Sequence, residues 1–416
     1  MKRLSAYLEE AYLEESKNTH MEHLEDAILN MGVEGAKQAI DYLRYVRDML
    51  GGNTKAPVNV TVKWDGAPAI FAGIDPNDGK FFVAKKGIFN KNPKIYKTDE
   101  DIDEDVGDKP SLANKMKLAL KHLPAVGIKG VVQGDFLYSK EDIRTVDIDG
   151  EPHITFHPNT IVYAIPKKSE LASRILASEF GVVWHTTYSG SDFESMSASF
   201  GKEIAGRFTK TKAVWSVDAT FSDVSGSATM TKKETEDFTK ILSNAGRIFS
   251  RLDRKVVDGI SDDPDLLLRV KAFINSKIKE GQRIRNTKSF VRDLVFHIEG
   301  HYQKQIDAKK TEKGKQTWRD KKTKALAYFV NVPQAEIIKL FDFYNLIVDA
   351  KQVLVKKLDK AKQINTLLLT PKGYEPTGQE GFVAIDHQGK NALKIVDRLQ
   401  FSHANFSPDI VKGWQK

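Results

Sequence analysis

The stretch VNVTVKWDGAPAIFAGIDP, residues 58–76, decides how this chain of 416 residues is interpreted. Valines alternate with polar residues from Val58 to Val62, the period of a strand with one buried and one polar face. Lys63 ends the polar face, directly before Trp64-Asp65-Gly66. Asp-Gly between two strand-like runs is typical of a hairpin turn, so a solvated lysine beside a turn is one interpretation. The other is a lysine nucleophile, held on a rigid strand two residues from a carboxylate.

The composition is typical of a globular protein of roughly two or three domains, with 40% hydrophobic and 29% charged residues. The chain has no cysteine, which excludes disulfides, thiolate zinc sites and cysteine nucleophiles. It has no run of about 18 apolar residues, and the basic N-terminus lacks the apolar core of a secretory signal. A Gly-x-x-x-x-Gly-Lys-Ser/Thr phosphate loop is also missing. We expect a cytoplasmic monomer with no membrane partner.

The charge is unevenly distributed along the chain. The net charge is +8, and residues 231–362 contain 30 Lys+Arg against 18 Asp+Glu, or +12, which leaves −4 for the remainder. A basic segment of this kind indicates a polyanionic partner such as nucleic acid. The alternative is an ordinary lysine-rich helical surface.

The periodicity divides the chain into four parts and predicts an α+β fold. Residues 1–55 have a helical pattern, 56–230 are the strand-rich first part of a core, 231–365 form a basic helical insertion, and 366–416 complete the core. We expect strands at 69–73, 81–85, 130–138, 160–165, 182–188, 382–386 and 392–396. Helices are expected at 111–123, with Ser111 as N-cap, and at 169–180. The acidic run 99–105 is predicted to be a solvated loop.

Four further motifs accompany Lys63-Trp64-Asp65-Gly66, most of them on predicted strands. In chain order they are Lys85-Lys86-Gly87, Gly134-Asp135, Tyr163 in IVYAIP, and the pair Glu380-Gly381 and Lys394 on consecutive strands. Each residue alone is more often structural than functional. The order of the whole set is much harder to obtain by accident.

This ordered set resembles the covalent nucleotidyltransferases, which comprise the ATP-dependent DNA and RNA ligases and the mRNA capping enzymes. The resemblance covers about 58–230 and 366–400, and it implies an antiparallel-sheet ligase adenylation core. Some positions depart from the family pattern. Lys86 replaces the usual arginine, Asp135 replaces a glutamate, and Val396 replaces the second lysine of a Lys-x-Lys motif.

The resemblance implies a role for each residue. Lys63 would attack the α-phosphate of ATP, with Lys394 and Mg²⁺ (or Mn²⁺) neutralising charge. Glu380 is the first candidate for the metal, followed by Asp65. Asp135 and Lys86 would hold the ribose, and Tyr163 would stack on the adenine. The AMP would pass to a nucleic-acid 5′-phosphate, and a 3′-hydroxyl would displace it to seal the strands.

The expected activity is therefore an ATP-dependent polynucleotide ligase, with a slight preference for a DNA ligase acting on nicked duplexes of DNA, RNA or hybrid strands. The nearest alternative is an RNA-repair ligase. Alternatives of other classes are a non-catalytic nucleic-acid-binding protein with a decayed ligase core, and a protein-modifying AMP transferase. Pro68 stands where cellular DNA ligases place an arginine, which leaves the DNA or RNA preference open.

Two larger departures concern the architecture. Only 22 residues follow Lys394, so we expect a core without the C-terminal OB domain. A compact, phage-like ligase would be consistent with this expectation. The basic insertion lies between Tyr163 and Glu380. We expect it to bind the nucleic acid in place of the missing domain, through Lys321, Lys322 and Lys324.

Overall fold

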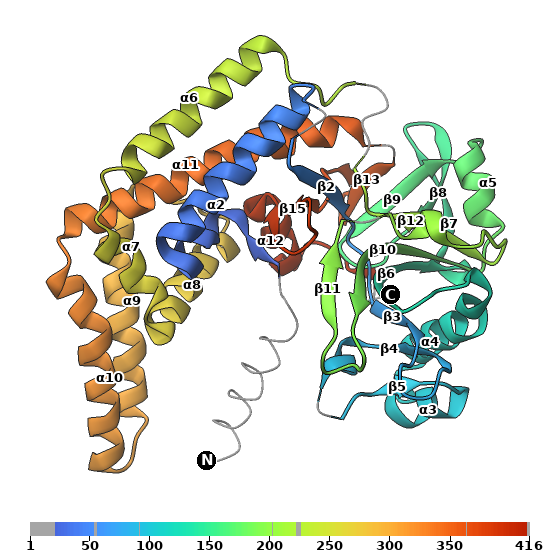
Figure 1. Ribbon diagram of the computed structural model, residues 1–416, viewed down its shortest axis with the longest axis horizontal. Coiled ribbons are helices and arrows are strands. Elements are labelled where there is room, and N and C mark those ends of the chain that lie inside the picture. Colours follow the sequence, from blue (N-terminus) through green and yellow to red (C-terminus); the bar gives the residue numbers. More distant parts are fainter. Residues whose placement is uncertain are drawn as a thin grey trace.

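The fold was analysed in a computed structural model that describes residues 21–413, except 54, 55, 91, 202, 222–225 and 363 (Figure 1). Residues 1–20, the beginning of the expected N-terminal helical segment, lie outside the described residues. The molecule is a mixed α+β structure with three sheets, and all the named strand pairs are antiparallel except β1–β16 and β10–β12. The predicted α+β class is confirmed, as are the seven expected strands, whose ends agree within two residues.

Sheet one has four strands in the order β1-β16-β15-β2. They are β1 (Glu22–His23), β16 (Ala392–Ile395), β15 (Gly381–Asp386) and β2 (Val58–Lys63). The alternation in β2 has the predicted effect. Val58 and Val60 belong to the core shared with the helices, whereas Thr61 and Lys63 line a cavity on the other face.

Sheet two has seven strands and forms the opposite wall of that cavity. Its order is β11-β10-β6-β3-β4-β5, and β12 also pairs with β10. The strands are β11 (Ser197–Phe200), β10 (Phe180–Ser189), β6 (Val131–Ser139), β3 (Ala69–Ile74), β4 (Phe81–Ala84), β5 (Ile95–Tyr96) and β12 (Val214–Asp218). Helices α3 (Asp99–Val106) and α4 (Pro110–His122) contribute to a core with this sheet.

Sheet three was only partly predicted, because it joins segments about 200 residues apart. Its order is β14-β13-β9-β8-β7. The strands are β14 (Gly373–Pro376), β13 (Asn365–Thr370), β9 (Ile161–Pro166), β8 (Glu151–Phe156) and β7 (Arg144–Ile148), and α5 (Glu170–Leu176) packs beside β9. Only β9 was expected as a strand. The chain therefore pairs with β9 again as soon as the helical insertion ends.

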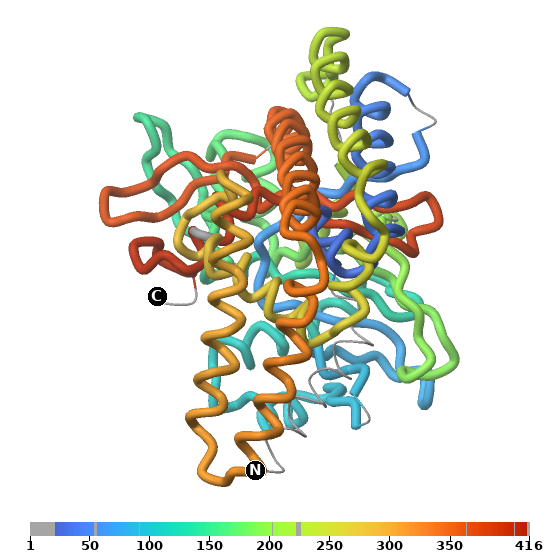
Figure 2. The backbone as a smooth tube through the Cα atoms, turned by 90° about the vertical axis from the view of Figure 1, so that its left-hand side faces the viewer, coloured from blue at the N-terminus to red at the C-terminus, as the bar shows by residue number. Residues whose placement is uncertain are grey.

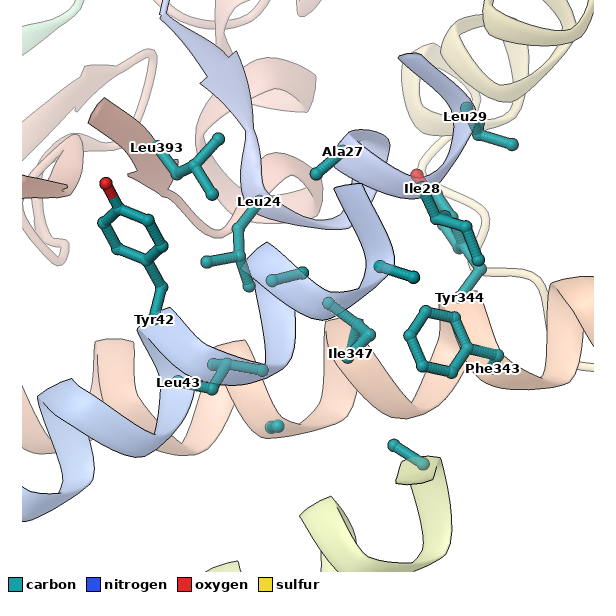
Figure 3. Packing of buried hydrophobic residues seen from close by; sticks show 14 of the residues in the cluster. Leu24, Ala27, Ile28, Leu29, Tyr42, Leu43, Phe343, Tyr344, Ile347 and Leu393 are labelled. Carbon is teal, nitrogen blue, oxygen red and sulfur yellow. The ribbon is translucent and has the colours of Figure 1, made fainter. Parts of the chain in front are cut away.

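The helices of the N-terminal part and of the insertion share one hydrophobic core with sheet one. This helical lobe comprises α2 (Ala27–Leu50), α6 (Lys232–Phe249), α7 (Arg254–Ser261), α8 (Pro264–Lys279), α9 (Thr287–Asp307), α10 (Glu312–Asn331) and α11 (Gln334–Leu358). Figure 3 shows Leu24, Ile28 and Leu43 packed near Phe343 and Ile347 of α11. The insertion is thus anchored to the strands that carry Lys63 and Lys394.

Helix α2 is kinked at Met31 and Gly32, within the part of the chain that was expected to be helical. Gly32 has φ +58°, and a Cβ there would meet Asp258 Oδ1 of α7 at 2.1 Å. Asp258 accepts a hydrogen bond from the Val33 amide at 3.0 Å, which satisfies a backbone donor that the kink exposes. Leu24 and Ile28 are buried, whereas Met31 is exposed.

Two local predictions are wrong, for reasons of helix capping. The acidic run 99–105 lies in helix α3 rather than in a loop, because Thr98 and Asp101 form a capping box. Acidic side chains in a first turn also complement the helix dipole. Ser111 is not an N-cap, since α4 begins at Pro110, which the first position of a helix tolerates well.

Three buried ion pairs connect the helical lobe to the segment after β16. Lys351 of α11 donates to both oxygens of Glu25 at 2.6 Å. Arg398 begins α12 (Arg398–Phe406) and contacts Asp26 at 3.1 Å and Glu25 at 3.5 Å. Tyr344 also donates to Asp26 at 3.0 Å.

Among the described residues, no helix has the length and apolar character needed to cross a membrane.

Candidate active site

A cavity of about 440 Å³ lies between sheet one and sheet two. This volume is within the range of small-molecule sites in proteins. Its charged lining comprises Lys63, Asp65, Lys86, Asp135, Glu380 and Lys394, which the sequence analysis had selected. The structure therefore brings together side chains from widely separated segments of the chain.

Lys63 and Glu380 form an ion pair at the centre of this lining. Lys63 is opposite Gly381, the first residue of β15, and Glu380 directly precedes that residue. Burial alone would lower the pKa of Lys63, but the carboxylate of Glu380, together with Asp135 and Asp65, raises it above the ordinary lysine value. Burial, opposed by Lys63, raises the pKa of Glu380 to about 7. The lysine is therefore protonated in the absence of ligand, beside a carboxylate that binds protons readily.

The hairpin interpretation of Trp64-Asp65-Gly66 is wrong. The two flanking strands do not pair, because β2 belongs to sheet one and β3 to sheet two. The connection instead crosses from one wall of the cavity to the other, and Ala67 N donates to Phe136 O at 2.9 Å. Gly66 is required by this close approach, since a Cβ there would lie 2.5 Å from the Cβ of Asp135.

Asp65 anchors this connection to sheet three. Its Oδ2 accepts hydrogen bonds from the amides of Thr160 and Ile161, each at 2.7 Å, and its Oδ1 accepts from Asn159 at 2.8 Å. Burial raises the pKa of Asp65, although these hydrogen bonds oppose the shift. Because both oxygens already have donors, the contacts support a structural role and leave Glu380 as the better metal candidate.

Tyr163 does not line the cavity, although the resemblance assigned it to the adenine. Its ring stacks on Trp64 at a centroid distance of 5.0 Å and on Phe156 at 5.2 Å. Its hydroxyl accepts a hydrogen bond from the Asp65 amide at 2.7 Å. The side chain is 3% exposed and packed between two rings, so in this conformation it has no free face for a base.

The remaining cavity residues occupy opposite walls. Lys394 projects from β16, and burial together with the charge of Lys63 lowers its pKa. Lys86 follows β4 and is exposed at the cavity. Asp135 lies on β6, with His185 Nε2 3.6 Å from its Oδ2. Three cations and three carboxylates thus line one space, a charge pattern suited to phosphates and a metal ion.

Sequence analysis missed four aromatic residues of the cavity wall, among them His185 and Tyr188 on β10. Tyr188 donates a hydrogen bond to Gln133 of β6 at 2.6 Å. Strand β10 was predicted, but simple alternation would put His185 and Tyr188 on opposite faces. The register of β10 with β6 is irregular between Trp184 and Thr186, and both side chains line the cavity.

Lys321, Lys322 and Lys324 lie on α10 and do not line the cavity. Each is paired with a carboxylate of a neighbouring segment. The pairs are Lys321–Asp265 at 3.8 Å, Lys322–Glu299 at 3.0 Å and Lys324–Asp263 at 3.1 Å. Their charges help to hold the helices of the lobe together.

Comparison with known sequence families gives one match. The family is described as a family of unknown function, DUF6267, and the match covers residues 18–409. The chain belongs to this family. The matched range includes both the strands of the cavity and the helical insertion, so one family model covers the two parts of the chain. No curated protein and no solved structure matches the chain.

Proposed function

We propose that this protein is an ATP-dependent polynucleotide ligase that carries AMP on Lys63. The observation that carries the proposal is the convergence of Lys63, Lys86, Asp135, Glu380 and Lys394 on one cavity. These residues come from five segments, and they are the residue types that covalent nucleotidyl transfer requires. A set of independent structural residues has no reason to meet in this way.

Glu380 is suited to activate the nucleophile. An amine attacks phosphorus only in its neutral form, and Lys63 already donates to Glu380. Lys63 holds its proton before ATP binds, so Glu380, with its pKa raised to about 7, would accept that proton during the transfer itself. The Lys63 Nζ–Pα bond then forms as the bond from Pα to pyrophosphate breaks. Pyrophosphate leaves with that electron pair, and the nitrogen releases its second proton to solvent.

The two later steps move the adenylyl group to nucleic acid and then release it. A 5′-phosphate oxygen attacks the adenylyl phosphorus and displaces Lys63. A 3′-hydroxyl then attacks the 5′-phosphorus, and AMP leaves. Lys86 and Lys394 would neutralise phosphate charge in these steps, and Asp135 would accept a hydrogen bond from the ribose. We expect His185 and Tyr188, which line the cavity, to contact the base in place of Tyr163.

The cavity fits a magnesium ion that takes most of its ligands from phosphates and water. Mg²⁺ usually binds one or two protein carboxylates, and Glu380 would be the first of these. Among the described residues there is no group of three or more His, Asp or Glu side chains that would enclose a metal by themselves. When bound, the ion would supply charge neutralisation on the phosphates.

The substrate is tested with nicked duplexes in which each side of the nick is DNA or RNA. We expect sealing that requires ATP and a 5′-phosphate, together with a transient 5′-adenylated strand. Sealing of nicks with DNA on both sides would support the DNA ligase, and sealing only next to RNA would support the RNA-repair alternative. A protein-modifying AMP transferase would form no adenylated strand, and a decayed binding protein would not react with ATP.

The rate of Lys63 adenylation should increase about tenfold between pH 6 and pH 8, at saturating ATP and subsaturating Mg²⁺, where a bound metal ion does not hold Glu380 in its ionised form. The reason is that a carboxyl with a pKa of about 7 is protonated at pH 6 and cannot accept the lysine proton. The measurement is the single-turnover rate of label transfer from α-labelled ATP.

Glu380→Asp is the control for this pH profile. If Glu380 sets the profile, the shorter carboxylate should shift its midpoint. A midpoint that is unchanged in the variant would instead assign the titration to the nucleotide and contradict the role of Glu380.

A further inference from the structure

Helices α9 and α10 form a hairpin that projects from the rest of the molecule (Figures 1 and 2). They pack against each other along their length. A helix of this size is about 30 Å long, so the turn between them lies well away from the base of the hairpin. The turn residues do not line the cavity.

The charges of the hairpin differ between its body and its tip. In the body, Lys321, Lys322 and Lys324 are paired with carboxylates. The tip, defined here as residues 309–315, has four lysines for which the described part of the chain provides no ion pair, namely Lys309, Lys310, Lys313 and Lys315. Its one carboxylate, Glu312, is paired with Arg319. Unpaired positive charge is therefore concentrated at the end of the projection.

An aromatic side chain lies among these cations. Lys309 Nζ is 5.4 Å from the ring centroid of Trp318, and Lys321 Nζ is 5.0 Å from it. The residues 309–315 themselves contain no large apolar side chain (KKTEKGK), so the tip has little apolar area for a protein partner. Four neighbouring cations of this kind match the closely spaced phosphates of a duplex.

We propose that the tip of the α9–α10 hairpin binds the phosphate backbone of duplex nucleic acid at a distance from the reacting ends. This inference rests on the proposed ligase function for the identity of the polyanion. The hairpin is about 30 Å long and its tip does not line the cavity, so the tip would contact duplex that flanks the nick and not the nick itself. Contacts to phosphates alone position a duplex without reading its sequence.

The test is a variant with all four tip lysines changed to glutamine, K309Q/K310Q/K313Q/K315Q, in the full chain. Binding to a nicked duplex is measured by fluorescence anisotropy from low to moderate salt. If all four lysines contact phosphates, the slope of log affinity against log salt should fall by about 3 to 4. In the double variant K313Q/K315Q, this slope should fall by about half as much. Adenylation of Lys63 without nucleic acid should be unchanged in both, which also shows that they fold.

The matched control removes the same charge elsewhere, in K167Q/K168Q/K232Q/K233Q. These four lysines are exposed and outside the hairpin. An unchanged salt slope in the tip variant would show that the tip lysines contact no phosphates. An equal fall in the control would show that they contribute only net charge. Either result would overturn the proposal. The ligase function is judged separately, since its failure would appear as missing adenylation of the wild type, whatever the slopes.

Discussion

Lys63→Ala should reduce the sealing of a 5′-phosphate nick at least about a thousandfold. The variant should still seal a nick whose 5′-phosphate already carries AMP. The difference arises because Lys63 forms bonds only in the two transfers that create the adenylated strand. The last step requires the cavity and the 3′-hydroxyl but not the lysine nucleophile. The measurement is the yield of sealed strand from the two substrates, at equal protein and Mg²⁺ concentrations.

Lys97→Ala is a suitable control for this prediction. Lys97 is also a partly buried lysine paired with a buried carboxylate, since its Nζ lies 2.6 Å from Asp75, but it does not line the cavity. We expect this variant to seal both substrates nearly as well as the wild type. Loss of both reactions in Lys63→Ala would mean that the cavity had collapsed, and full activity on both would exclude Lys63 as the nucleophile.

Lys351→Met should lower the free energy of unfolding by about 3–5 kcal/mol. Lys351 is 1% exposed and binds both oxygens of Glu25, so its removal leaves a buried carboxylate poorly compensated. The double variant Glu25→Gln/Lys351→Met removes both charges and should recover part of the loss. The measurement is the denaturant dependence of the helical signal.

The exposed pair Lys37–Glu34 provides the comparison for the buried pair. Lys37→Met should cost less than about 1 kcal/mol, because water solvates both partners when they separate. An equal cost at the two sites would contradict the account of the buried pairs. Glu25 contacts Arg398 as well as Lys351, and Arg398 follows Lys394 of β16 by four residues. We therefore also expect Lys351→Met to move β16 and slow adenylation.

The sequence was sufficient to predict the structure where a single residue type or a local hydrophobic period determines it. The alternation in β2 placed its valines toward the helices and Lys63 toward the cavity. The helical insertion was recognisable from its amphipathic pattern, and Thr231 caps its first helix, α6. Six of the charged residues selected from motifs meet at one site, because strand ends and register bring them together.

The errors arose where a tertiary contact decides the structure. The Asp-Gly turn signal after Lys63 was overruled because β2 and β3 join different sheets. The aromatic Tyr163 is enclosed by Trp64 and Phe156, and no local pattern predicts which face of β9 is covered. His185 was missed because only the pairing of β10 with β6 brings it to Asp135. The charge excess at 231–362 was visible, but the ion pairs that neutralise Lys321, Lys322 and Lys324 depend on helix packing.

The central claim is that Lys63 carries AMP, and the most direct test is the mass of the intact protein after incubation with ATP and Mg²⁺, followed by peptide mapping. The account predicts a gain of one adenylyl group, located on the peptide that contains Lys63, and its removal by added pyrophosphate. GTP should give no comparable adduct. A folded protein that is not already adenylated and gains no mass with ATP, or an adduct on another residue, would contradict the account.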